Sequence, residues 1–268
     1  MAAAPVGALL LALPLGVAVL GPLFAEAPAT GVAAPYAGGD STHLLGTDGL
    51  GRDVLALLLH GGRSALGMAL GAVAVAYLIG GFLGLLAAST RRRWADELLI
   101  RPLDVLLPLP TLLVISVIAV GWRGSPIAIA LAVAAVNVPP VARLVRAAAL
   151  DAASSPVTEA LRVQGESRVR IQLDHIARSV LAPVAADIGT RITLAVFLVA
   201  SANFLGLGLS PTAPDWAVSI SRSREGLLLQ PWAVLAPAAL LVMFTVGLNL
   251  LADRVLARSR RRTQEDLR

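Results

Sequence analysis

The side chains that could carry out chemistry are few in this sequence and stand far apart. The histidines lack the spacing of metal ligands, so we expect no metal site; they are His43, His60 and His175. The candidate serine nucleophiles have no plausible base partner; they are Ser64, Ser201 and Ser210. The chain contains no cysteine, which excludes disulfides and thiol catalysis. We therefore expect a protein without a catalytic site and without a cofactor of its own.

One oppositely charged pair lies in the middle of an apolar segment. Asp187 and Arg191 are four residues apart, so each can neutralise the other along a helix. Charge within a bilayer is costly and usually faces a bundle interior or water. Two interpretations stay open: an ion pair satisfied within its own helix, or a charged lining of a translocation path. Asn137 is a further candidate for the path, although Asn137 and Asn249 more simply predict hydrogen bonds between helices.

Residues 155–165 predict a short polar helix between two apolar segments. Ser155 can cap its amino end, and Pro156 suits the first helical position. Glu159 lies near that end, where the helix dipole favours an anion, and Gly165 can adopt the left-handed conformation that ends a helix. One face combines the apolar side chains of Val157, Ala160 and Leu161. Two interpretations stay open: an amphipathic linker on the lipid headgroups, or a helix that a soluble partner grips.

A second polar stretch, residues 43–54, contains the charged side chains of Asp48, Arg52 and Asp53. The dipeptide Asp48-Gly49 is typical of a turn, and the three charged residues could pair locally. The alternative is a contact surface for another protein. Further along the chain, we expect Trp216 to be an anchor at the membrane interface.

These polar segments are carried by a chain that is otherwise strongly apolar. Of its 268 residues 57% are hydrophobic, and the mean hydropathy is +0.78. A soluble domain is less apolar and richer in charge. Because about 20 apolar residues cross a bilayer as a helix, we place six spans at 5–24, 65–88, 98–120, 126–142, 179–206 and 231–252. The sequence therefore predicts an all-α polytopic membrane protein.

The arginines give the orientation of these spans. They cluster after the second span, between the fourth and fifth, and after the sixth. Since short cytoplasmic loops carry the positive excess, residues 91–97, 143–178 and 253–268 are expected in the cytoplasm and residues 25–64 outside. Both termini are then cytoplasmic, and the first span, which lacks a charged leading region, is retained rather than cleaved. Arginines without an aromatic platform do not predict nucleic-acid binding.

Four motifs resemble those of ABC-importer permeases. One is similar to the EAA loop of that family through Glu159-Ala160, Gly165, Ile171, His175-Ile176 and Pro183. The outer stretch resembles a signature of the dipeptide, oligopeptide and nickel branch through Gly46, Thr47, Asp48, Gly51, Arg52 and Asp53. The third span is similar through Arg101, Asp104, Pro108 and Pro110. The end of the fifth is similar through Phe204-Leu205-Gly206-Leu207-Gly208, Pro211, Pro214 and Trp216. The chain departs from the family pattern at Leu161, Ala177-Arg178-Ser179, Arg191 and Val199.

The resemblance implies the ABC importer type I permease fold with six transmembrane helices, in the second-permease branch. It implies that residues 155–167 dock one of two cytoplasmic ATPases, which bind the ATP, while a homologous second permease completes the translocation path. It also implies an extracytoplasmic substrate-binding protein that delivers a short peptide, a nickel or other metal complex, or a similar solute. The chain would then divide into a first span (1–24), an outer segment (25–64), a permease core (65–252) with a coupling loop (143–178), and a basic tail (253–268).

Two functions of other classes remain as alternatives. A stand-alone secondary transporter predicts inverted repeats and broken helices with ion-coordinating groups near the midplane. We find no such repeat, and Asp187 is the sole acid within the spans of the second half. A non-transporting membrane scaffold would not need a docking helix. The sequence therefore favours the permease subunit of a pump.

Overall fold

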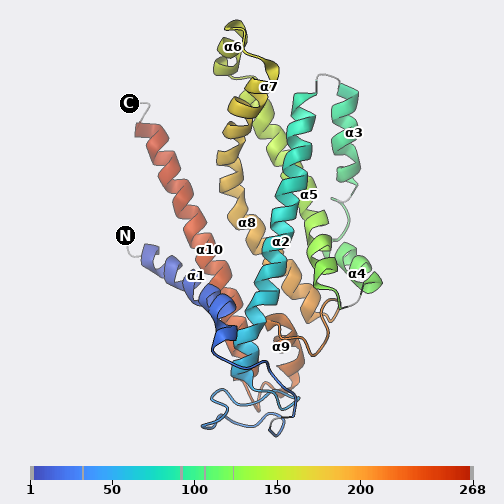
Figure 1. Cartoon of the computed structure of the whole chain (residues 1–268), viewed down its shortest axis with the longest axis vertical. Helices are drawn as coiled ribbons and strands as arrows, with labels where there is room; N and C mark the ends of the chain where they lie inside the picture. Colours follow the sequence, from blue (N-terminus) through green and yellow to red (C-terminus); the bar gives the residue numbers. More distant parts are fainter. Residues whose placement is uncertain (1–2, 32, 91–92, 106, 123, 266–268) are drawn as a thin grey trace.

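The chain folds into a bundle of helices in its computed structural model, which describes residues 3–31, 33–90, 93–105, 107–122 and 124–265 (Figure 1). The helices are α1 (Ala3–Leu20), α2 (Val54–Ser89), α3 (Arg93–Asp104), α4 (Thr111–Gly121), α5 (Pro126–Ala153), α6 (Pro156–Val163), α7 (Arg168–Arg170), α8 (Ala177–Phe204), α9 (Trp216–Ser223) and α10 (Trp232–Glu265). Outside the described residues lie Arg91, Arg92 and Arg123, and positions 266–268 of the predicted tail.

Five segments of the described chain are long and apolar enough to cross a membrane. They are Pro5–Leu23, Val54–Ser89, Pro126–Ala153, Arg168–Phe204 and Trp232–Arg254. The predicted all-α membrane fold is therefore confirmed, although most helices run past the predicted edges. The second begins at Val54 rather than 65, because the side chain of Asp53 accepts the N–H of Leu55 at 2.8 Å and caps the helix. The last continues as a helix through most of the predicted tail.

The third predicted span, 98–120, is wrong as a single helix. Helix α3 ends at Asp104 and α4 begins at Thr111. Pro108 and Pro110 lie between them, and a proline disfavours helical geometry in the residue before it. The 11 residues of α4 rise only about 16 Å, about half of a hydrocarbon core. The carboxylate of Asp104 meets Nη2 of Arg143 in α5 at 2.7 Å, which ties the end of α3 to the bundle.

Helices α2 and α5 form the closest pair in the bundle, and glycines permit their approach. A Cβ atom at Gly84 would lie 2.6 Å from the carbonyl oxygen of Ala142, and one at Gly80 would lie 2.8 Å from that of Val138. Small residues four apart are typical of close packing between membrane helices. Helix α8 contacts both α2 and α5, whereas α1 packs mainly on α10 and diverges from the other helices (Figure 1).

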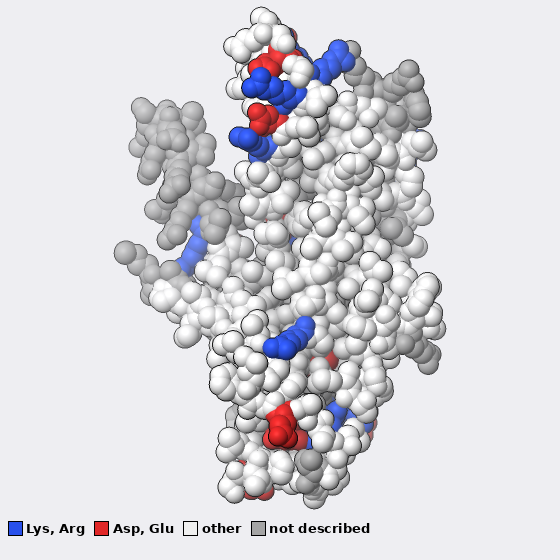
Figure 2. All heavy atoms as spheres, viewed as in Figure 1, with Lys and Arg blue, Asp and Glu red and all other residues white. Residues whose placement is uncertain are grey.

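The two ends of the bundle differ. One end carries α6, α7 and the carboxyl ends of α2 and α5; we name it the arginine-rich end (Figure 1). The opposite end carries α9 and the loop before α2. Figure 2 shows charged side chains gathered around α6 and α7 and, below them, a broad face that is largely uncharged. This division matches a helical bundle whose middle lies in lipid.

Candidate functional site

The short helix α6 is built as its sequence predicts at the amino end. Ser155 has extended backbone angles, and its hydroxyl oxygen accepts the N–H of Thr158 at 3.3 Å. Pro156 is the first helical residue, where its missing N–H costs nothing. Glu159 follows within the first turn, at the positive end of the helix dipole.

The carboxyl end of α6 is closed by a glycine in the left-handed region. Gly165 has a φ of +81°, as predicted, and a Cβ there would meet nothing within 4 Å. The N–H of Glu166 donates to the carbonyl oxygen of Leu161 at 3.1 Å, and the N–H of Gly165 donates to that of Arg162 at 3.1 Å. These two bonds form a Schellman end, which reverses the chain and satisfies the last carbonyls.

One side of α6 packs on the bundle and the other side is uncovered. Thr158 is fully buried, and its hydroxyl donates to the carbonyl oxygen of Ala152 at 2.7 Å. Leu161 packs against the apolar cluster around Val145. The three residues of the predicted apolar face differ in burial: Leu161 is half-buried, while Val157 and Ala160 are exposed. The uncovered side also carries Val163, which is 81% exposed.

The segment after α6 packs on the bundle and leads into α8. Ile171 and Ile176 are buried in the same apolar cluster as α5, and the π-helical turn between them runs without a break into α8. The side-chain amide of Gln172 donates to the carbonyl oxygen of Leu85 in α2 at 3.3 Å. These contacts join the segment after α6 to α2, α5 and α8. Further exposed apolar side chains, which the sequence analysis missed, are those of Val169 and Leu173 in this segment.

Asp187 and Arg191 meet as their spacing predicts. Nε of Arg191 lies 2.8 Å from Oδ2 of Asp187, and the hydroxyl of Tyr77 in α2 donates to the same oxygen at 2.8 Å. The two side chains are 18% and 19% exposed. The carboxylate is thus fully compensated within the chain, and the tyrosine is a partner that sequence spacing could not reveal.

The two candidate asparagines differ. Asn249 donates to the hydroxyl of Thr193 in α8 at 3.2 Å, so the expected bond between helices is confirmed. Asn137 is buried and donates to the carbonyl oxygen of Val133 in its own helix at 2.8 Å, so that expectation is wrong for this residue. Its Oδ1 has no partner among the described residues.

In the loop before α2, Asp48 and Arg52 form a buried ion pair. Nη2 of Arg52 lies 2.6 Å from Oδ2 of Asp48, and Nη1 donates to the carbonyl oxygen of Thr212 at 2.9 Å. Arg52 is only 1% exposed. The predicted local pairing is confirmed, whereas these two residues do not form a contact surface. Their role is to fasten the loop to the segment before α9.

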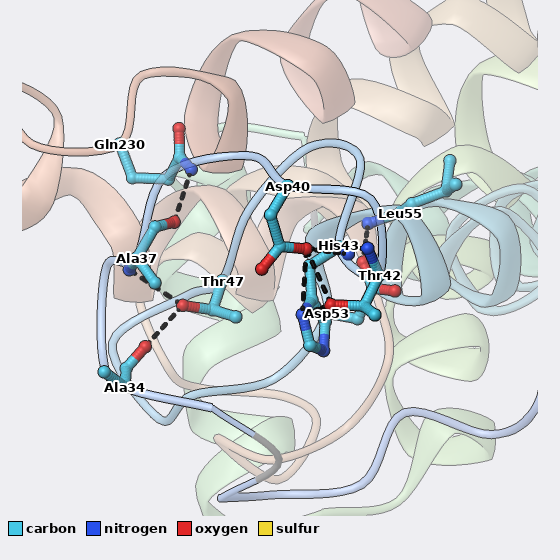
Figure 3. Close-up of polar contacts among 9 residues, drawn as sticks. All are labelled: Ala34, Ala37, Asp40, Thr42, His43, Thr47, Asp53, Leu55 and Gln230. Atoms are coloured by element: carbon cyan, nitrogen blue, oxygen red, sulfur yellow. Dashed lines mark hydrogen bonds and ion pairs between the residues drawn. The ribbon is translucent and has the colours of Figure 1, made fainter.

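The rest of the outer motif shapes this loop (Figure 3). The hydroxyl of Thr47 donates to the carbonyl oxygen of Ala34 at 2.6 Å and accepts the N–H of Ala37 at 2.9 Å. The side-chain amide of Gln230 donates to the carbonyl oxygen of Ala37 at 2.9 Å. The chain turns through positive φ angles at the two motif glycines, which are Gly46 and Gly51.

A separate hydrogen-bonded turn lies on the surface of the loop (Figure 3). Oδ1 of Asp40 accepts the hydroxyl of Thr42 at 2.7 Å and the N–H groups of Thr42 and His43 at 2.7 and 2.6 Å. These bonds, first that from the Thr42 hydroxyl, lower the pKa of Asp40 to about 2. Among the described residues, no group of three or more His, Asp or Glu side chains could hold a metal ion.

Trp216 and Asp215 together lock α9 onto α2. Trp216 is fully buried, and a Cβ added at Gly61 or Gly62 would collide with its ring, so the expected interfacial anchor is wrong. Asp215 accepts the hydroxyl of Ser64 at 2.7 Å and the N–H of Ala217 at 2.9 Å. Burial raises the pKa of Asp215.

Comparisons with known proteins agree with this architecture. A family model described as "Binding-protein-dependent transport system inner membrane component" matches residues 80–265. The di/tripeptide transport system permease protein DppC of Pseudomonas aeruginosa is 32% identical over 217 residues, which are 81% of this chain and 71% of that protein. The glutathione transport system permease protein GsiD of Pectobacterium atrosepticum is 34% identical over 218 residues, again 81% of this chain and 71% of that protein. A chain of the inward-facing MetNI methionine ABC transporter shares the fold, with a TM-score of 0.61, 17% identity, and coverage of 75% of this chain and 95% of that chain.

The helical bundle and the matching family model define a class: the inner-membrane permease component of an ABC importer, with the type I permease fold. The chain belongs to the family of binding-protein-dependent transport system inner membrane components. Within it, the chain is of the DppC type. The resemblance drawn from the four sequence motifs is confirmed.

Proposed function

We propose that α6 is the helix through which an ATPase subunit drives this permease, and that the solute moved is a short peptide. The observation that carries the proposal is the geometry of α6: a helix fixed at both ends, with a buried inner side and an uncovered outer side. Val157 and Val163 offer apolar contact there, and Glu159 adds an exposed charge. A helix with a free apolar side suits a groove on a soluble partner.

Force applied to α6 has a direct route into the bundle. Thr158 bonds to the end of α5, Leu161 packs into the cluster shared by α5 and α8, and Gln172 bonds to α2. Closing of the ATPase would therefore move these three helices together. Such motion is a two-state switch in which the ligand binds one state more tightly than the other.

Membership in the family supports a proposal for the rest of the assembly. We infer that the arginine-rich end and both termini are cytoplasmic, since the arginines cluster there. Two ATPase subunits bind and hydrolyse the ATP, a second permease completes the path, and an extracytoplasmic protein delivers the solute. This chain, on the proposal, hydrolyses nothing and contacts only lipid and these proteins.

The choice of a peptide as solute rests on the relatives. Two of them are named as permeases of di/tripeptide transport and of glutathione transport. A third, from Escherichia coli and 31% identical, is named as a probable D,D-dipeptide transport permease. A nickel complex stays the second candidate, because the outer motif resembles a branch that includes nickel permeases. Which solute the binding protein retains on purification decides between them.

Whether Asp187, Arg191 and Asn137 line the path is a separate question. Tyr77 joins the ion pair from α2, and Val180 and Val184, on the same face of α8, pack within the chain. This geometry supports an internal role for the pair ahead of a role in the path. Asn137, being buried, lines a path only if the bundle opens.

The test is Gly165→Val. A β-branched residue at a φ of +81° is strained, so the turn after α6 should be redirected and the uncovered side misplaced. Gly124→Val is the matched control, because Gly124 also has a positive φ, +79°, and open space around it. We expect normal membrane abundance for both variants, with uptake and ATPase association lost only in Gly165→Val. Wild-type uptake by Gly165→Val at equal abundance would show that residues 155–167 are only a linker.

A further inference from the structure

A cavity of about 190 Å³ lies at the root of α6, at the arginine-rich end. It is enclosed by the carboxyl end of α2, the end of α5 and the segment that follows α6. Its polar lining consists of Ser89, Thr90, Arg162, Arg168 and Gln172. Its volume is several times the roughly 30 Å³ share of one water molecule, so it has room for a larger polar group.

The charge of this cavity is positive. Among the described residues, no carboxylate lines it, and Arg168 makes no ion pair. Arg162 meets Glu159 at 3.3 Å on the outer side of α6. At least one full positive charge therefore faces the cavity without compensation, and an anion is the ligand that it fits.

A neighbouring cavity of about 240 Å³ makes the contrast clear. It is lined by Arg170 and Arg178, and each of these has a carboxylate partner. Glu166 lies 3.0 Å from Arg170, and Asp174 lies 2.8 Å from Arg178. The two cavities belong to one loop, yet only the first presents an arginine without an acid.

The helix ends at the first cavity also favour an anion. Arg168 begins the helical segment 168–204, whose amino end carries a partial positive charge. The carboxyl end of α2 carries a partial negative charge, which opposes the binding of an anion. Part of this charge is compensated, because the hydroxyls of Ser89 and Thr90 both donate to the carbonyl oxygen of Leu86. That carbonyl oxygen is therefore already compensated.

The position of the cavity suggests which anion. The apolar run of α2 ends at Ser89, so the cavity lies where a bilayer's hydrocarbon gives way to its headgroups. Basic pockets between membrane helices bind anionic headgroups. We propose that this cavity binds a phosphate group through Arg162 and Arg168, supplied by an anionic phospholipid headgroup or by soluble phosphate. A bound phosphate would join α6 to the end of α2 and stiffen the connection. Phosphate binding does not depend on the proposed function of α6. Only the effect of bound phosphate on coupling rests on that proposed function.

The test measures lipid binding rather than transport. The full chain, purified in detergent, is titrated with phosphatidylglycerol, with phosphatidylcholine and with inorganic phosphate, and bound ligand is counted by native mass spectrometry. One variant combines Arg162→Gln with Arg168→Gln. The control combines Arg170→Gln with Arg178→Gln, which removes the same charge from the neighbouring cavity. Thermal unfolding confirms that both variants are folded.

The wild type should prefer phosphatidylglycerol to phosphatidylcholine, and the first variant should bind phosphatidylglycerol at least tenfold more weakly, given about one kcal/mol per arginine. The control should bind like the wild type. Binding of inorganic phosphate alone, lost in the first variant, would support the site and name the soluble source. Equal loss in both variants, no loss in the first, or no binding of either probe to the wild type would overturn the proposal.

Discussion

The indole Nε1 of Trp216 donates a hydrogen bond of 2.8 Å to the carbonyl oxygen of Leu58, although 158 positions separate the two residues. The ring packs against the part of α2 where Gly61 and Gly62 leave room for it. This contact joins α9 to the amino-terminal part of α2.

Replacing this tryptophan should destabilise the fold. Trp216→Ala leaves a cavity in the buried cluster and removes the hydrogen-bond donor of the Leu58 carbonyl oxygen. The free energy of unfolding should therefore fall by about 3–5 kcal/mol. Trp232→Ala is the control, since Trp232 is 54% exposed, and should change it by less than about 1 kcal/mol. Thermal unfolding in detergent measures both. Equal melting temperatures for the two variants would contradict the placement of α9.

The close contact of α2 and α5 should be sensitive to one methyl group. In Gly84→Ala the new Cβ would lie 2.6 Å from a backbone oxygen, so the helices must separate, at a cost of about 1–3 kcal/mol. Gly71 in the same helix has nothing within 4 Å, so Gly71→Ala should be neutral or stabilise the protein by up to about 1 kcal/mol. Unfolding in denaturant or heat compares the two. The packing is refuted if Gly84→Ala is as stable as Gly71→Ala.

Asp215 should make stability depend on pH. Burial raises the pKa of Asp215 in the folded state above its ordinary value of 3.8, so the folded state binds the proton more tightly. The stabilisation is complete below about pH 3.8 and declines as the pH rises toward the folded-state pKa. Asp215→Asn removes the titration, so its stability relative to the wild type should rise across this interval. Melting temperatures of Asp215→Asn and of the wild type at several pH values test this. A difference between the two proteins that stays constant or falls as the pH rises would argue against the buried carboxylate.

Two variants distinguish the two interpretations of the ion pair between Asp187 and Arg191. Asp187→Asn leaves the arginine unpaired, so abundance and stability should fall, by roughly 3 kcal/mol. Adding Arg191→Gln should restore both expression and uptake, because Tyr77 and the neighbouring helices need no charge there. Expression by immunoblot and uptake of labelled peptide measure this. A double variant with normal abundance and poor uptake would instead place the pair in the path.

Local chemistry made most of this protein predictable. The five long apolar helices follow from hydropathy, and the ends of α6 follow from Ser155 and Gly165, because caps and turns depend on a few neighbouring residues. The break in the third span was also predictable, because Pro108 and Pro110 lie within it. A continuous apolar pattern across the break concealed it.

Features that depend on distant contacts were not predictable. The burial of Arg52 requires the carbonyl of Thr212, 160 positions away, and that of Trp216 requires two glycines in another helix. Tyr77 gives no signal of its role until α2 and α8 are side by side. The uncovered side of α6 likewise depends on which residues α5 covers.

The most direct test of the docking role is a cross-link from α6 to the ATPase. The chain has no cysteine, so a single one can be placed at Val163, which is 81% exposed. Leu228, at the opposite end and 98% exposed, is the position for the control. A thiol-to-amine reagent is applied to membranes in which each variant retains wild-type uptake, and the ATPase is detected by immunoblot. The account predicts a product containing the ATPase from Val163→Cys and none from Leu228→Cys. A yield at Val163 no greater than at Leu228 would contradict it.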